Sequence, residues 1–383
     1  MKFVIAPDSF KGGLTAKQAA EAMKTGLARV YPDADYTLVP MADGGEGTVQ
    51  SLVDATRGHF YTEQVTGPLG TQVAAKFGIL GDGQTGVIEM SQASGIQFVN
   101  EQTRNPLITT TYGTGELILK ALDQGISKLI LGIGGSATND GGAGMAQAIG
   151  AQLLDQAGNQ IEVGGGQLDQ LEKIDISKVD PRIKDLEILI ASDVTNPLVG
   201  PDGASAVFGP QKGATPEMVK VLDDNLRHYA EIIKRDLHAD LADYPGAGAA
   251  GGLGAGLLAF TNSTMEKGVE IVVEYSGLKK KAQGADFVFT GEGGIDFQTK
   301  FGKTPYGVAL ATKQVAPNAP VIVIAGSVGD GINELYSEKS IDAIFTSVAG
   351  VKTLQEALDT APHDVAQVAE NIGRLVAKTL AKS

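Results

Sequence analysis

Polar, glycine-rich segments follow several of the apolar runs of this sequence. Four of them combine glycine with aspartate, glutamate, serine or lysine: residues 8–13, 43–48, 134–140 and 291–296. A fifth segment, residues 192–196, is polar but has no glycine. Carboxylates of this kind suit Mg²⁺ through bound water molecules. Glycine-rich turns that lead into helices present backbone N–H groups to phosphate, and a nearby lysine stabilises a phosphoryl group in transfer. The segments therefore favour phosphoryl transfer over redox chemistry.

Each segment also has a purely structural interpretation. Aspartate at the end of a strand often forms a turn or caps a helix, so Asp8 or Asp43 taken alone is more often structural than catalytic. Pairs of glycine commonly serve packing or turns. The functional interpretation therefore rests on all five segments being predicted at, or facing, one edge of a sheet.

The segment GIGGSATNDGG, residues 132–142, allows two interpretations. Its first six residues match the G-x-G-x-x-G/A pattern of dinucleotide sites, and Asp155 stands near the spacing of a ribose-binding acid. A dinucleotide site needs a helix that starts within this pattern, and residues 139–142 would interrupt that helix. A loop that leads into a helix near Gly142, capped by Asp140, fits better. A phosphate or substrate loop is therefore favoured over a dinucleotide loop.

Other motifs are less decisive. The GKT at 302–304 ends like a Walker A loop, but Phe297 stands at the earlier glycine position of that motif. The G-x-G-x-x-G match at 246–251 follows Tyr-Pro instead of a strand. Arg104 either clamps a carboxylate or forms a surface ion pair, and Lys212 either faces a ligand or lies in a solvent loop.

Composition excludes several classes of protein. The formal charge of −14 at pH 7 argues against a nucleic-acid partner. The chain has no cysteine, which excludes disulfides and thiolate zinc sites, and its four histidines lack zinc-site spacing. The N-terminal apolar run is too short for a secretory signal, and no run is long enough to span a membrane. We expect a cytoplasmic protein without a membrane partner.

The elements that must position these residues alternate between strand and helix at both ends of the chain. Strands are predicted at 2–6, 36–40, 286–290, 320–325 and 342–347. Helices are predicted after an N-cap at Thr15 and at 48–55, 304–315, 353–358 and 363–381. Such alternation predicts a parallel sheet with helices on both faces and ligands at the carboxyl ends of its strands.

The middle of the chain has shorter, glycine-punctuated elements and a long polar helix near 216–237. We therefore predict an α/β fold of two domains. The first is a parallel-sheet, Rossmann-like domain made of both chain ends, residues 1–64 and 285–383. The second is an α/β domain, residues 65–284, inserted between those two parts.

Seven blocks of the sequence resemble the type I glycerate kinases, in the order of that family and across nearly the whole chain. They read APDSFKGGLTA (6–16), PMADGGEGT (40–48), RNPLITTTYGTGELI (104–118), GIGGSATNDGGAGM (132–145), SDVTNPLVGPDGASAVFGPQKGA (192–214), GAGAAGGLGAG (246–256) and GEGGIDFQTKFGKTP (291–305). The resemblance implies phosphorylation of D-glycerate by ATP with Mg²⁺, in a cleft between the two domains. It implies 2-phosphoglycerate as the product, with 3-phosphoglycerate as the alternative. An NAD-dependent oxidoreductase and a non-catalytic small-molecule binding protein are weaker alternatives.

Site residues follow from this resemblance. We expect Asp193 or Asp296 to accept the proton of the attacking hydroxyl and the other to lie near Mg²⁺, so both are candidate metal ligands. Lys11 is the expected catalytic partner of the transferring phosphate, and Arg104 the clamp for the carboxylate of glycerate. The other residues expected to bind substrate or phosphate are Asp8, Ser9, Asp43, Gly45, Gly134, Gly135, Ser136, Asn139, Glu292 and Lys303.

One position departs from the family pattern. Many type I glycerate kinases carry arginine where this chain has Gly294, so Lys300 or Lys303 is the candidate substitute. The sequence leaves the oligomeric state open between monomer and homodimer.

Overall fold

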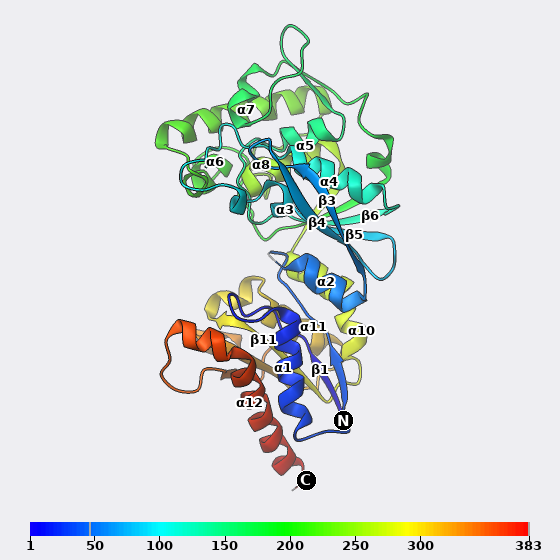
Figure 1. Cartoon of the computed structure of the whole chain (residues 1–383), viewed down its shortest axis with the longest axis vertical. Coiled ribbons are helices and arrows are strands. Elements are labelled where there is room, and N and C mark those ends of the chain that lie inside the picture. Colours follow the sequence, from blue (N-terminus) through cyan, green and yellow to red (C-terminus); the bar gives the residue numbers. More distant parts are fainter. Residues whose placement is uncertain (46, 382–383) are drawn as a thin grey trace. The chain divides into compact units, whose positions relative to one another are not determined.

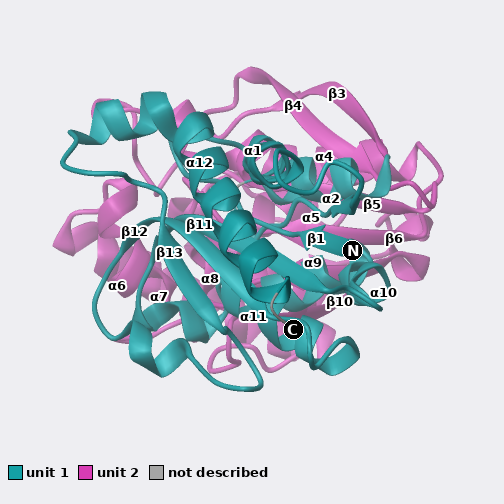
Figure 2. Ribbon diagram, turned by 90° about the horizontal axis from the view of Figure 1, so that it is seen from below, with its two compact units in different colours: residues 1–57, 268–383 teal, residues 58–267 magenta. Residues whose placement is uncertain are grey.

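The computed structural model describes residues 1–45 and 47–381. The chain divides into two compact units, residues 1–57 with 268–383 and residues 58–267, which are coloured teal and magenta in Figure 2. The α/β fold class is confirmed. The domain boundaries at 64/65 and 284/285 stay a prediction.

Unit 1 is built on a five-stranded sheet in the order β13-β12-β11-β1-β2. All four neighbouring pairs are parallel, as the alternation of elements predicts. The strands are β1 Lys2–Ile5, β2 Asp35–Leu38, β11 Phe287–Ile295, β12 Val321–Val328 and β13 Ala343–Thr346. The helices are α1 Ala16–Ala28, α2 Thr48–Thr56, α9 Gly268–Tyr275, α10 Leu278–Ala282, α11 Thr304–Val315 and α12 Leu354–Leu380.

Helices α1 and α12 lie side by side over one face of this sheet (Figures 1 and 2). Alternate strand residues, among them Phe3, Phe289 and Ile324, are buried against them in one apolar cluster. Gly26 permits the close approach of the two helices, because a Cβ there would lie 2.0 Å from the carbonyl oxygen of Ala366. Helix α1 begins where predicted, after a capping box between Thr15 and Gln18.

Two elements of unit 1 differ from the sequence-based prediction. Strand β11 continues to Ile295 because β12 extends beside it, with Gly294 paired to Ser327. Glu292 and Gly294 are therefore strand residues and do not belong to a loop. Helix α12 is one helix that continues through Pro362, where two helices were expected. Its residues after the proline pack on the sheet, and this packing outweighs the hydrogen bond that proline removes.

Unit 2 is built on a six-stranded mixed sheet in the order β10-β9-β6-β5-β4-β3. Its strands are β3 His59–Thr66, β4 Gln72–Ile79, β5 Thr85–Glu89, β6 Lys128–Gly132, β9 Glu187–Ala191 and β10 Asn262–Glu266. Only β3–β4 and β4–β5 pair antiparallel among these strands of the described chain. Strands β7 Gln152–Leu154 and β8 Lys173–Asp175 form a separate antiparallel pair.

The helices of unit 2 are α3 Ser91–Ser94, α4 Tyr112–Leu122, α5 Ala143–Ala148, α6 Ala204–Phe208, α7 Pro216–Leu237 and α8 Ala249–Phe260. Short 3-10 helices in the chain are η1 Ile96–Phe98, η2 Gly165–Gln170, η3 Pro181–Asp185, η4 Pro210–Lys212, η5 Phe297–Phe301 and η6 Ile332–Leu335. None of the helices within the described residues is both long and apolar enough to cross a membrane.

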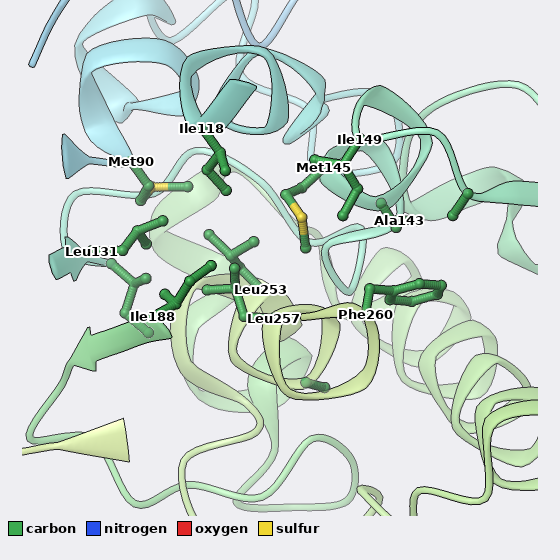
Figure 3. Packing of buried hydrophobic residues seen from close by; sticks show 14 of the residues in the cluster. Met90, Ile118, Leu131, Ala143, Met145, Ile149, Ile188, Leu253, Leu257 and Phe260 are labelled. Carbon is green, nitrogen blue, oxygen red and sulfur yellow. The ribbon is translucent and has the colours of Figure 1, made fainter. Parts of the chain in front are cut away.

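The core of unit 2 lies between its sheet and helices α4, α5 and α8. Figure 3 shows Leu131 of β6 and Ile188 of β9 with Met145 of α5 and Leu253 of α8. All four side chains are fully buried in one cluster. This core fixes the carboxyl ends of β6 and β9, from which the predicted substrate segments leave.

Candidate active site

A cavity of about 1070 Å³ opens in unit 1 beside the loops that leave the carboxyl ends of its strands. Its walls come from the loop after β1, the loop after β2, the end of β11 and the first turns of α12. Six of the residues predicted from sequence line it: Asp8, Ser9, Lys11, Asp43, Gly45 and Glu292. Lys11 is exposed, so its ammonium is available to a ligand.

Asp8 stands directly beyond β1 and is held by two donors. The Thr304 hydroxyl donates to its carboxylate at 2.6 Å, and the main-chain N–H of Ser9 donates at 2.5 Å. Burial raises the pKa of Asp8 to about 6, and the nearby charge of Asp43 adds to this, although both hydrogen bonds oppose it. Asp8 therefore changes charge just below neutral pH.

Glu292 projects from β11 into the same cavity. Burial raises its pKa to about 7, because the attraction of Lys303 is outweighed by burial together with the charges of Asp8 and Asp43. Asp43 itself accepts from the N–H of Gly45 at 3.0 Å, which fixes the turn after β2. The cavity thus holds two carboxyl groups whose pKa values are suited to proton transfer near neutral pH.

Asp296 has a structural task in this structure. It is the N-cap of η5, accepts from the N–H of Gln298 at 2.8 Å, and takes part in a capping box with Thr299. Its other neighbour is Lys303, whose Nζ lies 3.8 Å from the carboxylate. Within the described residues, the walls of the cavity include neither Asp296 nor Lys303.

The two lysines proposed as substitutes at Gly294 lie in different settings. Lys300 forms an ion pair with Glu334 of η6, so its charge is already compensated. The positive charge of Lys303 acts to lower the pKa of Glu292, although burial outweighs this effect. Gly294 lies in the cavity wall, and a Cβ there would lie 3.0 Å from the Ser327 hydroxyl. Lys303 is therefore the better placed of the two.

In unit 2, the segment after β6 runs as a loop into α5. Gly134 and Gly135 are exposed, Ser136 is partly exposed, and Asn139 is fully buried. The helix begins at Ala143, directly after Gly142, as predicted. The strand–loop–helix order therefore supports a substrate or phosphate loop with its open part at residues 134–136.

Asp140 fastens the inner end of this loop. Its carboxylate accepts from the N–H and the hydroxyl of Thr111 at 2.8 and 2.9 Å, and from the N–H groups of Gly142 and Gly144 at 3.2 and 3.3 Å. Complete burial raises its pKa, and the four donors oppose that rise. Asp140 thus serves the first turn of α5, although Gly142 occupies the N-cap position itself.

Lys212 is a site residue whose setting the sequence left open. It is 2% exposed, and its ammonium donates to the carbonyl oxygen of Thr138 at 2.6 Å and to the Ser136 hydroxyl at 3.2 Å. Burial lowers its pKa to about 7, although the charge of Asp140 partly opposes this. The solvent-loop interpretation is therefore wrong, and Lys212 supports the loop from beneath.

This arrangement decides the hydrogen-bonding role of Ser136. Its oxygen accepts from Lys212 Nζ and from the N–H of Thr138 at 3.1 Å, which uses both lone pairs. The single hydroxyl hydrogen is then left for donation, and its acceptors within the protein are the Thr138 hydroxyl at 3.1 Å and the Thr138 and Ala250 carbonyl oxygens at 3.3 Å. Ser136 is built as a donor, which suits an anionic ligand.

The second G-x-G-x-x-G match proves to be a packing device. Gly251 lies at the start of α8 with φ +70°, and its carbonyl oxygen accepts from the N–H of Gly141 at 3.0 Å. A Cβ on Gly251 would lie 2.0 Å from the carbonyl oxygen of Thr138. Glycine is therefore required here so that α8 can support the loop after β6.

The remaining predicted residues of unit 2 lie around this loop. Asp193 is exposed beyond β9, which pairs with β6 so that Ala191 stands opposite Gly132, and Asp193 thus shares a sheet edge with Gly134. Arg104 is exposed and packs on Gly213, where a Cβ would lie 2.7 Å from its Cγ. Arg104 therefore contacts the residue that directly follows Lys212 in the chain.

Asp155 does not take the position of a ribose-binding acid. It is exposed, and its carboxylate accepts from the N–H groups of Asn159 and Ala157 at 2.8 and 2.9 Å. These main-chain bonds, led by that of Asn159, lower its pKa. Asp155 is a turn-forming residue after β7, so the support for a dinucleotide site disappears.

Metal binding by Asp193 and Asp296 stays a prediction. Within residues 1–45 and 47–381, no group of three or more histidine, cysteine, aspartate or glutamate side chains is arranged to hold a metal ion. A cation here would have to complete its coordination with ligand oxygens or water, which is how Mg²⁺ is usually held beside phosphates.

The fold and these loops define an α/β protein whose polar residues gather at the carboxyl ends of parallel strands, where such folds bind their ligands. Residues 3–377 match the model of the glycerate kinase family, and the chain belongs to this family.

Named relatives cover the whole length. The chain is 53% identical to a Bacillus subtilis protein named glycerate kinase, over 99% of both chains. It is 51% identical to the Escherichia coli glycerate 2-kinase, over 98% of both chains. A crystal structure of a Salmonella typhimurium protein assigned as glycerate kinase 2 is 49% identical and superposes with a TM-score of 0.90 over 99% of each chain.

Proposed function

We propose that this protein is a glycerate kinase that transfers the terminal phosphoryl group of ATP to D-glycerate. The observation that carries the proposal is the match to the glycerate kinase family over residues 3–377. It is supported by carboxylates, glycine turns and a lysine on the loops where phosphoryl transfer needs them. Asp155 forms a turn and does not act as a ribose-binding acid, so the oxidoreductase alternative no longer has its support. The family to which the chain belongs consists of phosphotransferases acting on an alcohol group.

The proposed reaction is an in-line displacement. A hydroxyl oxygen of D-glycerate forms a bond to the γ-phosphorus, the bond to the β–γ bridging oxygen breaks, and ADP leaves. Mg²⁺ would neutralise charge on the phosphates, with Asp193 and Asp296 as the carboxylates proposed near it. Lys11 is proposed to stabilise the transferring group, and Arg104 to hold the carboxylate of glycerate.

The proton of the attacking hydroxyl must pass to a carboxylate. Asp193 and Asp296 are the sequence-based candidates, and capping of η5 already engages Asp296. Asp8 and Glu292 are a second pair of candidates, because their pKa values of about 6 and about 7 suit a base at neutral pH. Variants of the four residues distinguish these roles.

The test is ADP formation by the purified protein with Mg-ATP and D-glycerate. We expect ADP only when glycerate is present, and none after addition of EDTA. Phosphorus NMR of the product then separates 2-phosphoglycerate, the expected product, from 3-phosphoglycerate. Absence of glycerate-dependent ADP would remove the kinase proposal, whereas the 3-phospho product would correct only the position of transfer. A cytoplasmic location stays a prediction.

A further inference from the structure

The cavity of unit 1 has two ends of opposite character. Strand β2 lies at one edge of the sheet and β13 at the other. Asp43 follows β2, Asp8 follows the neighbouring strand β1, and Glu292 belongs to β11 beside β1, so this end is acidic. Helix α12 follows β13 and supplies the other end, where Leu354, Leu358 and other apolar residues line the wall.

The apolar end is formed by one face of α12. Leu354, Ala357, Leu358 and Ala361 recur at the helical spacing of three and four residues, and all four line the cavity. Leu358 lies against the glycine turn after β1, because a Cβ on Gly13 would lie 3.3 Å from its Cδ2. The turn and the helix therefore form one continuous wall.

Part of this apolar wall is exposed to water, which is energetically unfavourable. Leu354 is 77% exposed, although the same helix buries Ala361 and Val365 against the sheet. A continuous exposed apolar surface rimmed by polar residues is typical of a ligand-binding groove. Covering it with a flat apolar ligand would be favourable, because apolar surface would be removed from water.

Polar groups lie between the two ends. Ser327, Thr346 and Ser347 line the cavity where β12 and β13 end. Lys352 also lines it and is held in place by Thr360 and Asp364 of α12. These hydroxyl and ammonium groups suit a sugar joined to a phosphate chain.

We propose that unit 1 is the nucleotide-binding unit, with the adenine of ATP against Leu354 and Leu358 and the phosphates directed along the glycine turn toward Lys11. The assignment rests on the proposed function, which supplies ATP as the phosphoryl donor. Glycerate is small and anionic and has no apolar face to cover this wall. The volume of about 1070 Å³ lies just above the range of about 300–1,000 Å³ that is typical of small-molecule sites, so the cavity has room for a ligand much larger than glycerate.

The acidic end adds a condition. Asp8, Asp43 and Glu292 would repel a bare polyphosphate, since like charges in a partly desolvated site oppose one another. Nucleotide binding in this cavity should therefore depend on Mg²⁺, which travels with the phosphates.

The test is calorimetric binding of Mg-ADP to the full chain and to single variants on α12. Leu354→Ser and Leu358→Ala should each weaken Mg-ADP binding about five- to tenfold, as expected for loss of most of one apolar side-chain contact. Leu375→Ser is the matched control, because Leu375 is 63% exposed on the same helix and does not belong to the cavity wall as described. It should leave binding unchanged.

Inorganic tripolyphosphate with Mg²⁺ has no base, so its binding measures the phosphate contacts alone. The α12 variants should bind it as the unmodified protein does, and Lys11→Ala should weaken both ligands. Unchanged Mg-ADP binding in both leucine variants, or equal weakening of tripolyphosphate, would overturn the assignment. A folded variant is established by its unchanged thermal transition and by the tripolyphosphate binding itself.

The outcome is independent of the proposed reaction. If Mg-ADP binds and the leucine variants weaken it while glycerate yields no ADP, the nucleotide site stands and the kinase proposal falls. If glycerate is phosphorylated with an unchanged KM for ATP in both leucine variants, the kinase stands and this assignment falls.

Discussion

The ammonium of Lys212 lies 2.6 Å from the main-chain carbonyl oxygen of Thr138, inside the loop that joins β6 to α5. The same ammonium donates to Ser136, at the open part of that loop. A buried amino group therefore supports the three residues 136–138 from beneath while Gly134 and Gly135 stay open to solvent. The loop is stiff where it meets the core and accessible where a ligand would contact it.

Removal of this charge should loosen the loop. Lys212→Met should lower the free energy of unfolding by about 1–3 kcal/mol, the cost of losing its two hydrogen bonds. The pKa of about 7 lies below the ordinary value of 10.5, so between those values the unfolded chain holds more protons. Stability of the unmodified protein should therefore contain a term that rises with pH from about 7 to 10.5 and is absent from the variant.

Urea unfolding at pH 6, 7.5 and 9 measures this term. Lys184→Met, which removes an exposed lysine of the same unit, is the control and should keep the pH dependence. An identical pH dependence in Lys212→Met and in the unmodified protein would show that Lys212 has no lowered pKa.

The effect of the Thr304–Asp8 hydrogen bond on Asp8 can be tested with two threonine variants of α11, one that removes this bond and one that serves as its control. Thr304→Val removes the donor at 2.6 Å, so the pKa of Asp8 should rise further and stability should fall by about 1 kcal/mol. If turnover needs ionised Asp8, the acidic limb of the kcat/KM profile should move up by about 0.5–1 pH unit.

Thr312→Val is the control for this change. Thr312 is fully buried on the same helix, and its hydroxyl is among the buried side-chain atoms of the described residues that have no hydrogen-bond partner. Its replacement should be neutral or slightly stabilising and should leave the pH profile in place. A similar shift in both variants would trace the effect to α11 packing and not to Asp8.

Glu292 should make the protein less stable in alkali. Its folded-state pKa of about 7 exceeds the ordinary value of 4.5, so its favourable contribution is complete below 4.5 and is lost as the pH rises through 7. At pH 8 the free energy of unfolding of Glu292→Gln should therefore exceed that of the unmodified protein by about 1–3 kcal/mol, so the variant should unfold at a higher temperature, and it should show no such advantage at pH 4.5. Thermal melts at both pH values test this, and a gain that is equal at both would contradict it.

The role of Asp296 can be separated from its capping task. Asparagine caps helices about as well as aspartate, so Asp296→Asn should keep stability, whereas Asp296→Ala should lose about 1 kcal/mol. If Asp296 is the base, Asp296→Asn should lower kcat by a factor of about 10²–10⁴ without unfolding. A near-normal kcat in Asp296→Asn, with a large loss in Asp193→Asn, Asp8→Asn or Glu292→Gln, would move the base to that residue.

Alanine variants of Gly251 and Gly83 distinguish the energetic cost of backbone strain from that of a steric clash. Both have φ +70° and both lie in unit 2, but a Cβ at Gly83 would meet nothing within 4 Å. Gly83→Ala should cost about 1–2 kcal/mol, the strain of a left-handed residue. Gly251→Ala should cost more than this and also lower activity, because its Cβ would displace Thr138. Equal losses in chemical denaturation would argue against the contact.

Elements with strong local signals were predictable from the sequence. The run KFVIA, the Thr15 cap and the polar helix near 216–237 all form where expected, as β1, α1 and α7. The interruption by NDGG placed the start of α5 correctly. In each case neighbours within a few residues determine the conformation, so spacing and capping carry the information.

Other features depend on partners distant in sequence. β11 runs through Gly293 and Gly294 because β12 supplies hydrogen bonds there, against the low strand preference of glycine. Lys212 is buried because the loop after β6, more than seventy residues earlier, offers it a carbonyl oxygen and a hydroxyl. The identity of the residue suggested a ligand or a solvent loop, and only the tertiary contacts show that its partner is the protein itself.

Strand β1 pairs on one side with β2 and on the other with β11, with Phe3 opposite Tyr36 and Phe287. During translation, residues 58–267 are synthesised before β11 exists, while β1 and β2 form at most a two-stranded ribbon, which is marginal in water. Unit 2 can therefore fold while the chain is still growing, whereas unit 1 must wait for its carboxyl-terminal strands and for α12. Premature termination after residue 267 but before β11 would leave a complete unit 2 carrying an unfolded amino-terminal segment.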